Sequence, residues 1–296
     1  MASQKRRLGV IGGSGLYQAP GFSVAETRAF ETPWGRPSGP LVFGACDGVE
    51  TVFLSRHGPG HALTPDEVNY RANIDALKQA GVTDIISFSA CGSFREELAP
   101  GAFLIMDQYI DRTAGRASTF FGRGFVAHVS MADPVCAALS EALAAACADC
   151  DIVHQRGGTY LAINGPQFST RAESHLYRSW GCDVIGMTNM PEAKLAREAE
   201  LPYASVGMVT DYDCWRKDED AVDVAGVLAV MAKNTENAGR VIQAVCEILG
   251  PMRDPSPQGI ETCLDFAVIT APEARDPALC EKLKTIAGRY FDAQTG

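Results

Sequence analysis

Residues 203–213 read Tyr-Ala-Ser-Val-Gly-Met-Val-Thr-Asp-Tyr-Asp, an apolar run that ends in two carboxylates. The run predicts a buried strand, and the helix-forming sequence after it predicts an open α/β sheet, in which ligands bind beyond the carboxyl ends of the strands. If Asp211 and Asp213 converge on one ligand, we expect mutual repulsion to keep one of them protonated near neutrality. The competing interpretation is a solvated turn in which Asp213 caps the next helix.

Composition limits the class of protein. The chain has 296 residues, of which 46% are hydrophobic and 21% charged, so it can bury a large core. A net charge of −10 and a pI near 5.0 disfavour nucleic acid and anionic membranes as partners. Ten cysteines scattered through apolar stretches, with no signal peptide and no apolar run of 18 residues, predict a cytoplasmic protein that does not span a membrane.

Strand and helix signals alternate along the chain. Strands are predicted at 7–11, 51–55, 83–88, 102–107, 158–163, 183–186 and 203–209, and helices at 65–80, 134–149, 170–180, 191–200 and 222–249. This alternation predicts an α/β fold with a central mixed, mainly parallel sheet covered by helices. We expect one domain over residues 1–250 and a C-terminal extension over 251–296, packed on the same domain or on a neighbouring subunit.

Several predicted strands end in residues suited to holding an anion. Gly-Gly-Ser-Gly at 12–15 exposes backbone N–H groups, and Arg56 with His57 follows the second strand. Each segment alone is more typical of an ordinary turn. The glycine segment lacks the full Gly-x-Gly-x-x-Gly order, and no acidic ribose ligand follows the second strand, so a Rossmann-type dinucleotide-dependent oxidoreductase is disfavoured. The sequence offers no third rigid ligand for a metal site beside His57 and His61.

Taken together, these segments resemble the trimeric purine nucleoside phosphorylase superfamily, and most closely its 5′-methylthioadenosine phosphorylase family. The match runs from about residue 8 to residue 250. The motifs that carry it are IGGSGL at 11–16, SRHG at 55–58, VNYRANI at 68–74, ACGS at 90–93, DRT at 111–113, GPQFS at 165–169, VIGMT at 184–188 and TDYDCW at 210–215.

The resemblance implies a role for each site residue. It implies phosphate bound by Ser14, Arg56, His57, Ser89, Ala90 and Thr188, and a purine approached by Phe168, Met187, Asp211 and Asp213. It also implies a 5′ pocket formed by Val224 and Leu228 and completed by His128 of a neighbouring subunit. Ser169 stands where relatives that act on 6-oxopurines carry a glutamate.

The implied reaction is phosphorolysis of 5′-methylthioadenosine to adenine and 5-methylthioribose 1-phosphate, by a homotrimer that needs no metal or organic cofactor. One of the two aspartates would donate a proton to the purine and the other accept from the 6-amino group; the sequence does not assign these roles. A phosphorylase for 6-oxopurine nucleosides or methylthioinosine is the alternative within the class, disfavoured by Ser169. A catalytically silent nucleoside-binding protein is disfavoured because the phosphate ligands are retained.

Overall fold

The computed structural model describes residues 4–13, 15–16, 20–216 and 224–295; side chains at 224–227 and 295 are not described. Within these residues, eleven strands form one mixed sheet in the order β3-β4-β5-β2-β6-β11-β10-β8, while β12 pairs with β6 and β7, and β7 with β9. Its strands are β2 (Arg7–Gly12), β3 (Phe22–Arg28), β4 (Leu41–Cys46), β5 (Val49–Ser55), β6 (Asp84–Ser93), β7 (Phe103–Met106), β8 (Gln108–Asp111), β9 (His154–Arg156), β10 (Thr159–Ala162), β11 (Val184–Gly186) and β12 (Tyr203–Asp211).

Strand β6 is the centre of the sheet. Its first half pairs with β2 in parallel, its last residues pair with β11 in antiparallel, and β12 runs parallel to it along the other edge. Nearly every residue of β6 and β12 is buried, because helices cover both faces of the sheet. The mainly parallel, helix-covered α/β sheet predicted from the sequence is confirmed.

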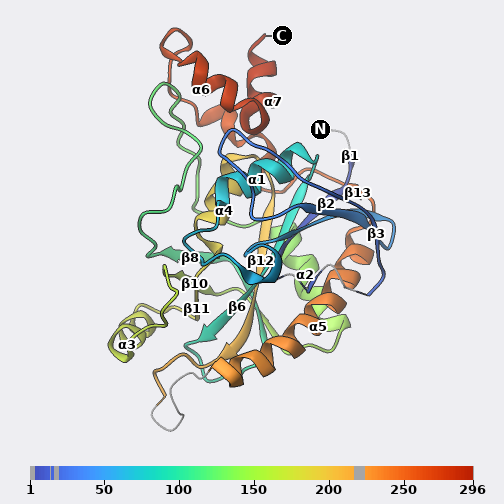
Figure 1. Cartoon of the computed structure of the whole chain (residues 1–296), viewed down its shortest axis with the longest axis vertical. Coiled ribbons are helices and arrows are strands. Elements are labelled where there is room, and N and C mark those ends of the chain that lie inside the picture. Colours follow the sequence, from blue (N-terminus) through green and yellow to red (C-terminus); the bar gives the residue numbers. More distant parts are fainter. Residues whose placement is uncertain (1–3, 14, 17–19, 217–223, 296) are drawn as a thin grey trace.

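The helices form two layers (Figure 1). On one face, α1 (Tyr70–Gln79) packs against α4 (Asn189–Glu198); on the other, α2 (Ala137–Asp149) packs against the long α5 (Val224–Leu249). Each layer closes its own apolar core against the sheet. The amphipathic helix α3 (Arg171–Ser179) begins with a capping box between Thr170 and Glu173, as the sequence predicts. Among the described helices, none combines the length and apolarity needed to cross a membrane.

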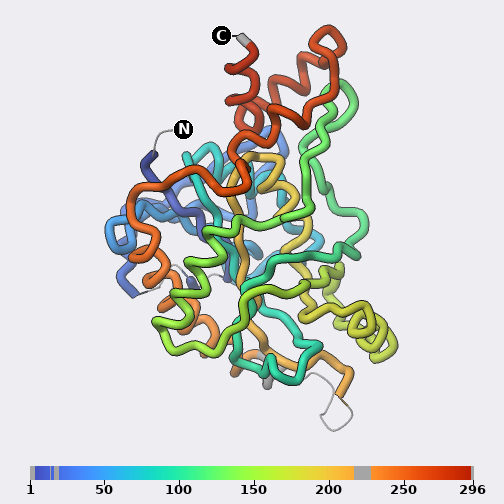
Figure 2. Tube along the Cα trace, turned by 180° about the vertical axis from the view of Figure 1, so that it is seen from behind, coloured from blue at the N-terminus to red at the C-terminus, as the bar shows by residue number. Residues whose placement is uncertain are grey.

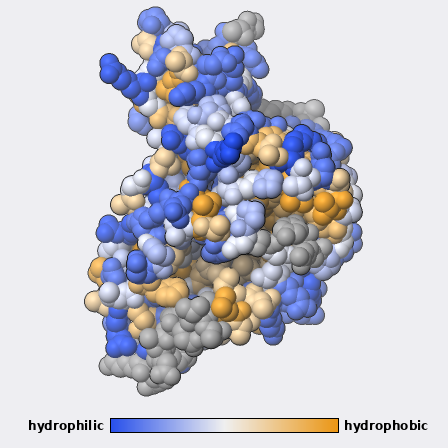
Figure 3. Space-filling view, in the orientation of Figure 1, coloured by the Kyte–Doolittle hydropathy of each residue, from blue (hydrophilic) through white to orange (hydrophobic). Residues whose placement is uncertain are grey.

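The C-terminal segment packs against the layer of α1 and α4. Its strand β13 (Met252–Arg253) pairs with β1 (Gln4–Lys5), and β13 is followed by the 3₁₀ helices η3 (Ile260–Phe266) and η4 (Pro272–Ala274) and by α6 (Pro277–Lys282) and α7 (Lys284–Thr295). Leu264, Leu283 and Ile286 are buried in the core layer that contains α1 and α4. Helices α6 and α7 project from one end of the molecule (Figure 2), and the exposed side chains there are mostly hydrophilic in the view of Figure 3.

Some details differ from the sequence prediction, among them strands β8 and β9, which lie outside the predicted strands. Helix α1 begins at Tyr70 and not near Pro65, because Asn69 caps it by accepting a hydrogen bond from the N–H of Ala72. The loop before it contains only the short 3₁₀ helix η2 (Pro59–His61). Strands β3 and β4 were not predicted; β3 is an exposed edge strand with few apolar residues, so its pattern is weak.

Candidate active site

A cavity of about 290 Å³ lies where β2 stops pairing with β6 and β11 begins. Such a change of strand order is the usual place for a ligand in an open α/β sheet. Ten of the fourteen residues predicted from the sequence line this cavity: Arg56, His57, Ser89, Ala90, Phe168, Ser169, Met187, Thr188, Asp211 and Asp213. Ser14 lies outside the described residues, as does the side chain of Val224.

Arg56 lies at one end of the cavity and is 2% exposed. Its guanidinium donates from Nε (2.8 Å) and Nη2 (3.1 Å) to the carboxylate of Glu192, from Nη2 to Ser87 Oγ (2.6 Å) and from Nη1 to the carbonyl of Phe88 (3.0 Å). Burial by itself would lower the pKa of Arg56, but the charge and hydrogen bonds of Glu192 raise it overall. The arginine is therefore a fixed cation.

His57 and two hydroxyls complete this end. His57 Nδ1 lies 2.9 Å from the carbonyl of Leu63, so Nδ1 carries the hydrogen and the neutral ring has a bare Nε2. Burial lowers the pKa of His57 to about 4, and the charge of Arg56 acts in the same direction. Ser89 Oγ lies 2.8 Å from Thr188 Oγ1, with both residues buried. Because β11 is antiparallel to β6, the chain leaving β11 brings Thr188 back beside Ser89.

The two aspartates lie on a distorted strand end. The register between β12 and β6 slips at Thr210, so that Asp211 pairs with Gly92. Asp213 has a left-handed backbone (φ 54°), and its N–H donates to Asp211 Oδ1 at 2.7 Å. Thr210 Oγ1 donates to Asp211 Oδ2 at 2.7 Å. The bulge and the turn together direct both carboxylates to the cavity wall.

Burial, more than repulsion, determines the protonation of this pair. Burial is the largest cause of the raised pKa of both Asp211 and Asp213. The charge of Asp211 adds a smaller contribution to the raised pKa of Asp213, whereas the charge of Asp213 is not among the causes at Asp211. Mutual repulsion, expected from the sequence to keep one carboxyl group protonated, therefore contributes less to the raised pKa than burial does. The raised pKa values still make it easier for one carboxyl group of the pair to be neutral beside the other.

The wall beside the aspartates is mostly apolar. Phe168 is 52% exposed at the rim, and Met187, Ile163 and Ile185 line the interior. The Ser169 hydroxyl is buried and, within the described part of the chain, has no hydrogen-bond partner. A flat heterocycle fits such a wall, with its edge toward the carboxyl groups.

Helix α5 forms the remaining side. Met231 and Thr235 line the cavity, whereas Leu228 is 58% exposed and does not. Positions 224, 228, 231 and 235 share one helical face, and the described cavity contacts on that face begin one turn beyond Leu228. His128 is exposed and outside the cavity of its own chain.

Comparisons with known proteins identify the family of the chain. A family model described as the phosphorylase superfamily matches residues 7–247. The S-methyl-5′-thioadenosine phosphorylase of Cereibacter sphaeroides is 55% identical over 287 residues, covering 97% of this chain and 99% of the relative. The chain belongs to the phosphorylase superfamily, within its S-methyl-5′-thioadenosine phosphorylase family.

Solved structures of this family share the fold. A methylthioadenosine phosphorylase from an antarctic soil metagenomic library is 47% identical with a TM-score of 0.89, covering 95% of this chain and 99% of that one. The methylthioadenosine phosphorylase of Schistosoma mansoni in complex with adenine is 38% identical with a TM-score of 0.81, over 87% and 96% of the two chains.

The sequence reasoning missed two residues whose buried side chains hold this cavity in shape. Arg116 donates to the carbonyls of Met187 (2.6 Å), Met190 (2.7 Å) and Asn164 (3.0 Å) and pairs with Asp66, so it ties together the loops around the apolar wall. Glu192 holds Arg56. Neither has a sequence signal of its own: Arg116 lies in a polar loop, and Glu192 reads as an ordinary acidic residue in the first turn of a helix.

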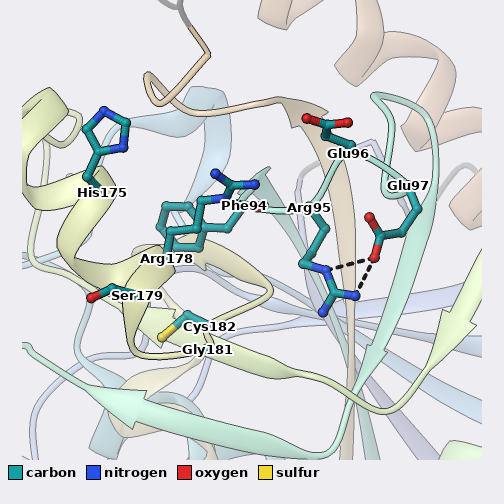
Figure 4. Close-up of a pocket in the computed structure, with 9 residues that line it drawn as sticks. All are labelled: Phe94, Arg95, Glu96, Glu97, His175, Arg178, Ser179, Gly181 and Cys182. Atoms are coloured by element: carbon teal, nitrogen blue, oxygen red, sulfur yellow. Dashed lines mark hydrogen bonds and ion pairs between the residues drawn. The ribbon is translucent and has the colours of Figure 1, made fainter.

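A wider, open hollow lies beside α3 and contains none of the predicted site residues (Figure 4). Its cations already have partners. Arg95 pairs with Glu97 and Asp183, and Arg178 donates to the carbonyl of Phe94. The cavity between the strand ends is therefore the candidate active site of this family member.

Proposed function

We propose that this chain cleaves 5′-methylthioadenosine with inorganic phosphate, giving adenine and 5-methylthioribose 1-phosphate. The observation that carries the proposal is the joining, in one cavity, of an anion-holding end with a pair of partly buried carboxyl groups at the end of β12. A phosphate oxygen bonds to C1′ as the C1′–N9 bond breaks. The electron pair of that bond goes to the purine, which gains the proton that phosphate loses.

The phosphate end holds the nucleophile below the sugar. Arg56, the Ser89 and Thr188 hydroxyls and the backbone around Ala90 supply donors, with Ser14 at the glycine turn as a further predicted ligand. Positive charge develops on the ribosyl ring in the transition state, and a phosphate held under it stabilises that charge.

The base end receives the leaving group. Adenine presents an acceptor at N7 and a donor at its 6-amino group, so a neutral carboxyl group beside a carboxylate matches it. The raised pKa of Asp211 and Asp213 favours this mixed state. Phe168 and Met187 contact the faces of the base, and Ser169 offers no carboxylate for the N1–H of a 6-oxopurine, which disfavours methylthioinosine and inosine.

The 5′ substituent faces α5. Met231 and Thr235 supply an apolar sulphur and a methyl group on the face that also carries Val224 and Leu228. An apolar wall favours a methylthio group over a hydroxyl.

We further propose a cytoplasmic homotrimer that requires no metal or organic cofactor, with phosphate as co-substrate. Support for assembly comes from exposed side chains in the two segments joined by the bridge between Ala127 and Val268, namely Phe266 (95% exposed), Ile269 (65% exposed) and His128. Exposed large apolar side chains of this kind mark protein interfaces. His128 would then reach the 5′ side of a neighbouring subunit's cavity.

The test is release of base from 5′-methylthioadenosine, adenosine, methylthioinosine and inosine, each with and without phosphate. We expect phosphate-dependent release of adenine, fastest from methylthioadenosine. Equal release without phosphate would show a hydrolase. For assembly, Phe266→Asp should convert a trimer to smaller species in sedimentation velocity; a wild-type monomer with full activity would contradict the shared site.

A further inference from the structure

The polar groups behind the phosphate end form one hydrogen-bonded network centred on Glu192. This carboxylate is 1% exposed and accepts four hydrogen bonds: two from Arg56 (2.8 and 3.1 Å), one from Ser87 Oγ (2.6 Å) and one from the Tyr203 hydroxyl (2.9 Å). Asn189, at the start of the same helix, donates to the Tyr203 hydroxyl at 2.9 Å. Each side chain of the network is buried.

The network occupies nearly all the hydrogen-bond donors of the Arg56 guanidinium. Arginine has five N–H donors, and four hydrogen bonds run from Arg56 to Glu192, Ser87 and Phe88. One N–H, on Nη1, is left for an anion. A forked, two-point grip on phosphate, which an unpaired arginine would offer, is therefore not available to Arg56 here.

Arg56 and Glu192 also cancel each other's charge. The carboxylate of Glu192 balances Arg56 at a separation of 2.8 Å, and burial together with the charge of Arg56 keeps the His57 ring neutral. Removing one partner from such a buried pair leaves an uncompensated charge, which is costly, so the pair is maintained as a unit. Phosphate then enters a pocket of directed donors and not a pocket of net positive charge.

We propose that Glu192 is a positioning residue for phosphorolysis: it holds Arg56 in one orientation, leaves a single guanidinium N–H for phosphate and balances the charge of the empty phosphate end. The inference rests on the proposed function, since it concerns the phosphate site of that reaction. It predicts that Glu192 acts on turnover more than on phosphate affinity. Losing the carboxylate loosens Arg56 but adds net positive charge, and the added charge attracts the anion.

The experiment measures kcat and the KM for phosphate in Glu192→Gln with methylthioadenosine as substrate. We expect kcat to fall at least 10-fold while the KM for phosphate stays within about threefold of wild type or decreases. Titration calorimetry with inorganic phosphate alone gives the affinity without turnover. Wild-type activity that is independent of phosphate would overturn the proposed function itself, whereas a phosphate-dependent wild type with an unaffected variant overturns only this inference.

A matched control is Glu200→Gln. Glu200 is also buried and bound to an arginine, Arg289, but lies away from the cavity under the C-terminal segment. The Glu200→Gln variant should have a lower melting temperature and an unchanged kcat. If Glu192→Gln behaves in the same way, Glu192 is only structural and the inference is wrong.

Two further variants keep the inference testable if Glu192→Gln does not fold. Tyr203→Phe removes one hydrogen bond to Glu192 without touching Arg56 and should lower kcat about threefold or more; unchanged kcat would contradict the role of the network. The double variant Arg56→Met with Glu192→Gln removes both charges. It should be no slower than Arg56→Met alone, since Glu192 acts through Arg56; a further 10-fold loss would show an independent role.

Discussion

The two ends of the cavity are built in opposite ways. At the phosphate end, Arg56, Ser89 and Thr188 are buried and bonded to other protein groups, and they come from strands whose regular pairing places them. At the base end, Asp211 and Asp213 depend on a bulge and a left-handed turn, and Phe168 is half exposed. The difference teaches that, in the reaction we propose, fixed donors hold the nucleophile, while the leaving group meets carboxyl groups whose pKa is raised by burial.

The largest expected effect is at the base end. Asp213→Asn or Asp211→Asn should lower kcat/KM for methylthioadenosine by roughly 10²-fold or more, because an amide neither supplies nor stores the transferred proton. Both must be measured, since a coupled pair can share its proton. Methylthioinosine should lose less, because an amide can donate to its 6-oxo group.

Tyr212→Phe is the control for the aspartates. Its hydroxyl donates to the carbonyl of Glu96 and is not on the cavity wall, so activity should stay near wild type. If both asparagine variants keep the wild-type rate and the wild-type preference for methylthioadenosine over methylthioinosine, residues 211–213 are only a turn.

The second expected effect tests whether the bulge is needed. A Cβ at Gly92 would lie 2.8 Å from Asp211 Oδ1 and 3.3 Å from Asp213 Cβ, so Gly92→Ala should displace the carboxylates and reduce kcat/KM roughly 10- to 100-fold. Gly122→Ala, which has no neighbouring atom within 4 Å, is the control. Equal activity of the two variants would show that the aspartates tolerate displacement and that the geometry of this end is not strict.

The third prediction concerns the wall between the two ends. Met231→Thr should lower the ratio of kcat/KM for methylthioadenosine to that for adenosine, because a shorter, polar side chain no longer favours the methylthio group. The lost discrimination corresponds to roughly 1 to 3 kcal/mol. Ile248→Thr, exposed near the end of the same helix, is the control. If Leu228→Thr changes the ratio more than Met231→Thr does, the 5′ group contacts the earlier turn of α5.

The smallest expected effect is the pH response of the phosphate end. The folded pKa of His57 is about 4, below the ordinary value of 6.5, so the unfolded chain takes up this proton first as pH falls. The stabilisation is therefore complete above pH 6.5 and is lost as pH falls towards 4, by about 1 to 2 kcal/mol after allowance for partial exposure. Urea unfolding at pH 7 and pH 5 should show a larger loss in wild type than in His57→Gln; equal losses would mean that His57 is protonated in the folded protein.

The sequence by itself determined the central strands of the sheet, their helical cover and ten residues of the cavity wall. Apolar runs that end in polar residues place those residues at strand ends, and parallel strands collect their ends at one edge. That local pattern is why Arg56, Ser89 and Asp211 could be grouped from the order of residues alone. The family motifs added the residues whose own pattern is weak, such as Phe168 and Ser169.

Only the tertiary structure decided how these groups are bonded and charged. Nothing local shows that Glu192, 136 residues from Arg56 in the chain, cancels its charge, or that Arg116 joins three loops. The bulge at Thr210 arises from pairing with β6, and the raised pKa of the aspartates comes from burial by distant segments. Strand ends follow from local pattern, but hydrogen-bond partners and dielectric environment depend on which distant residues the fold brings together.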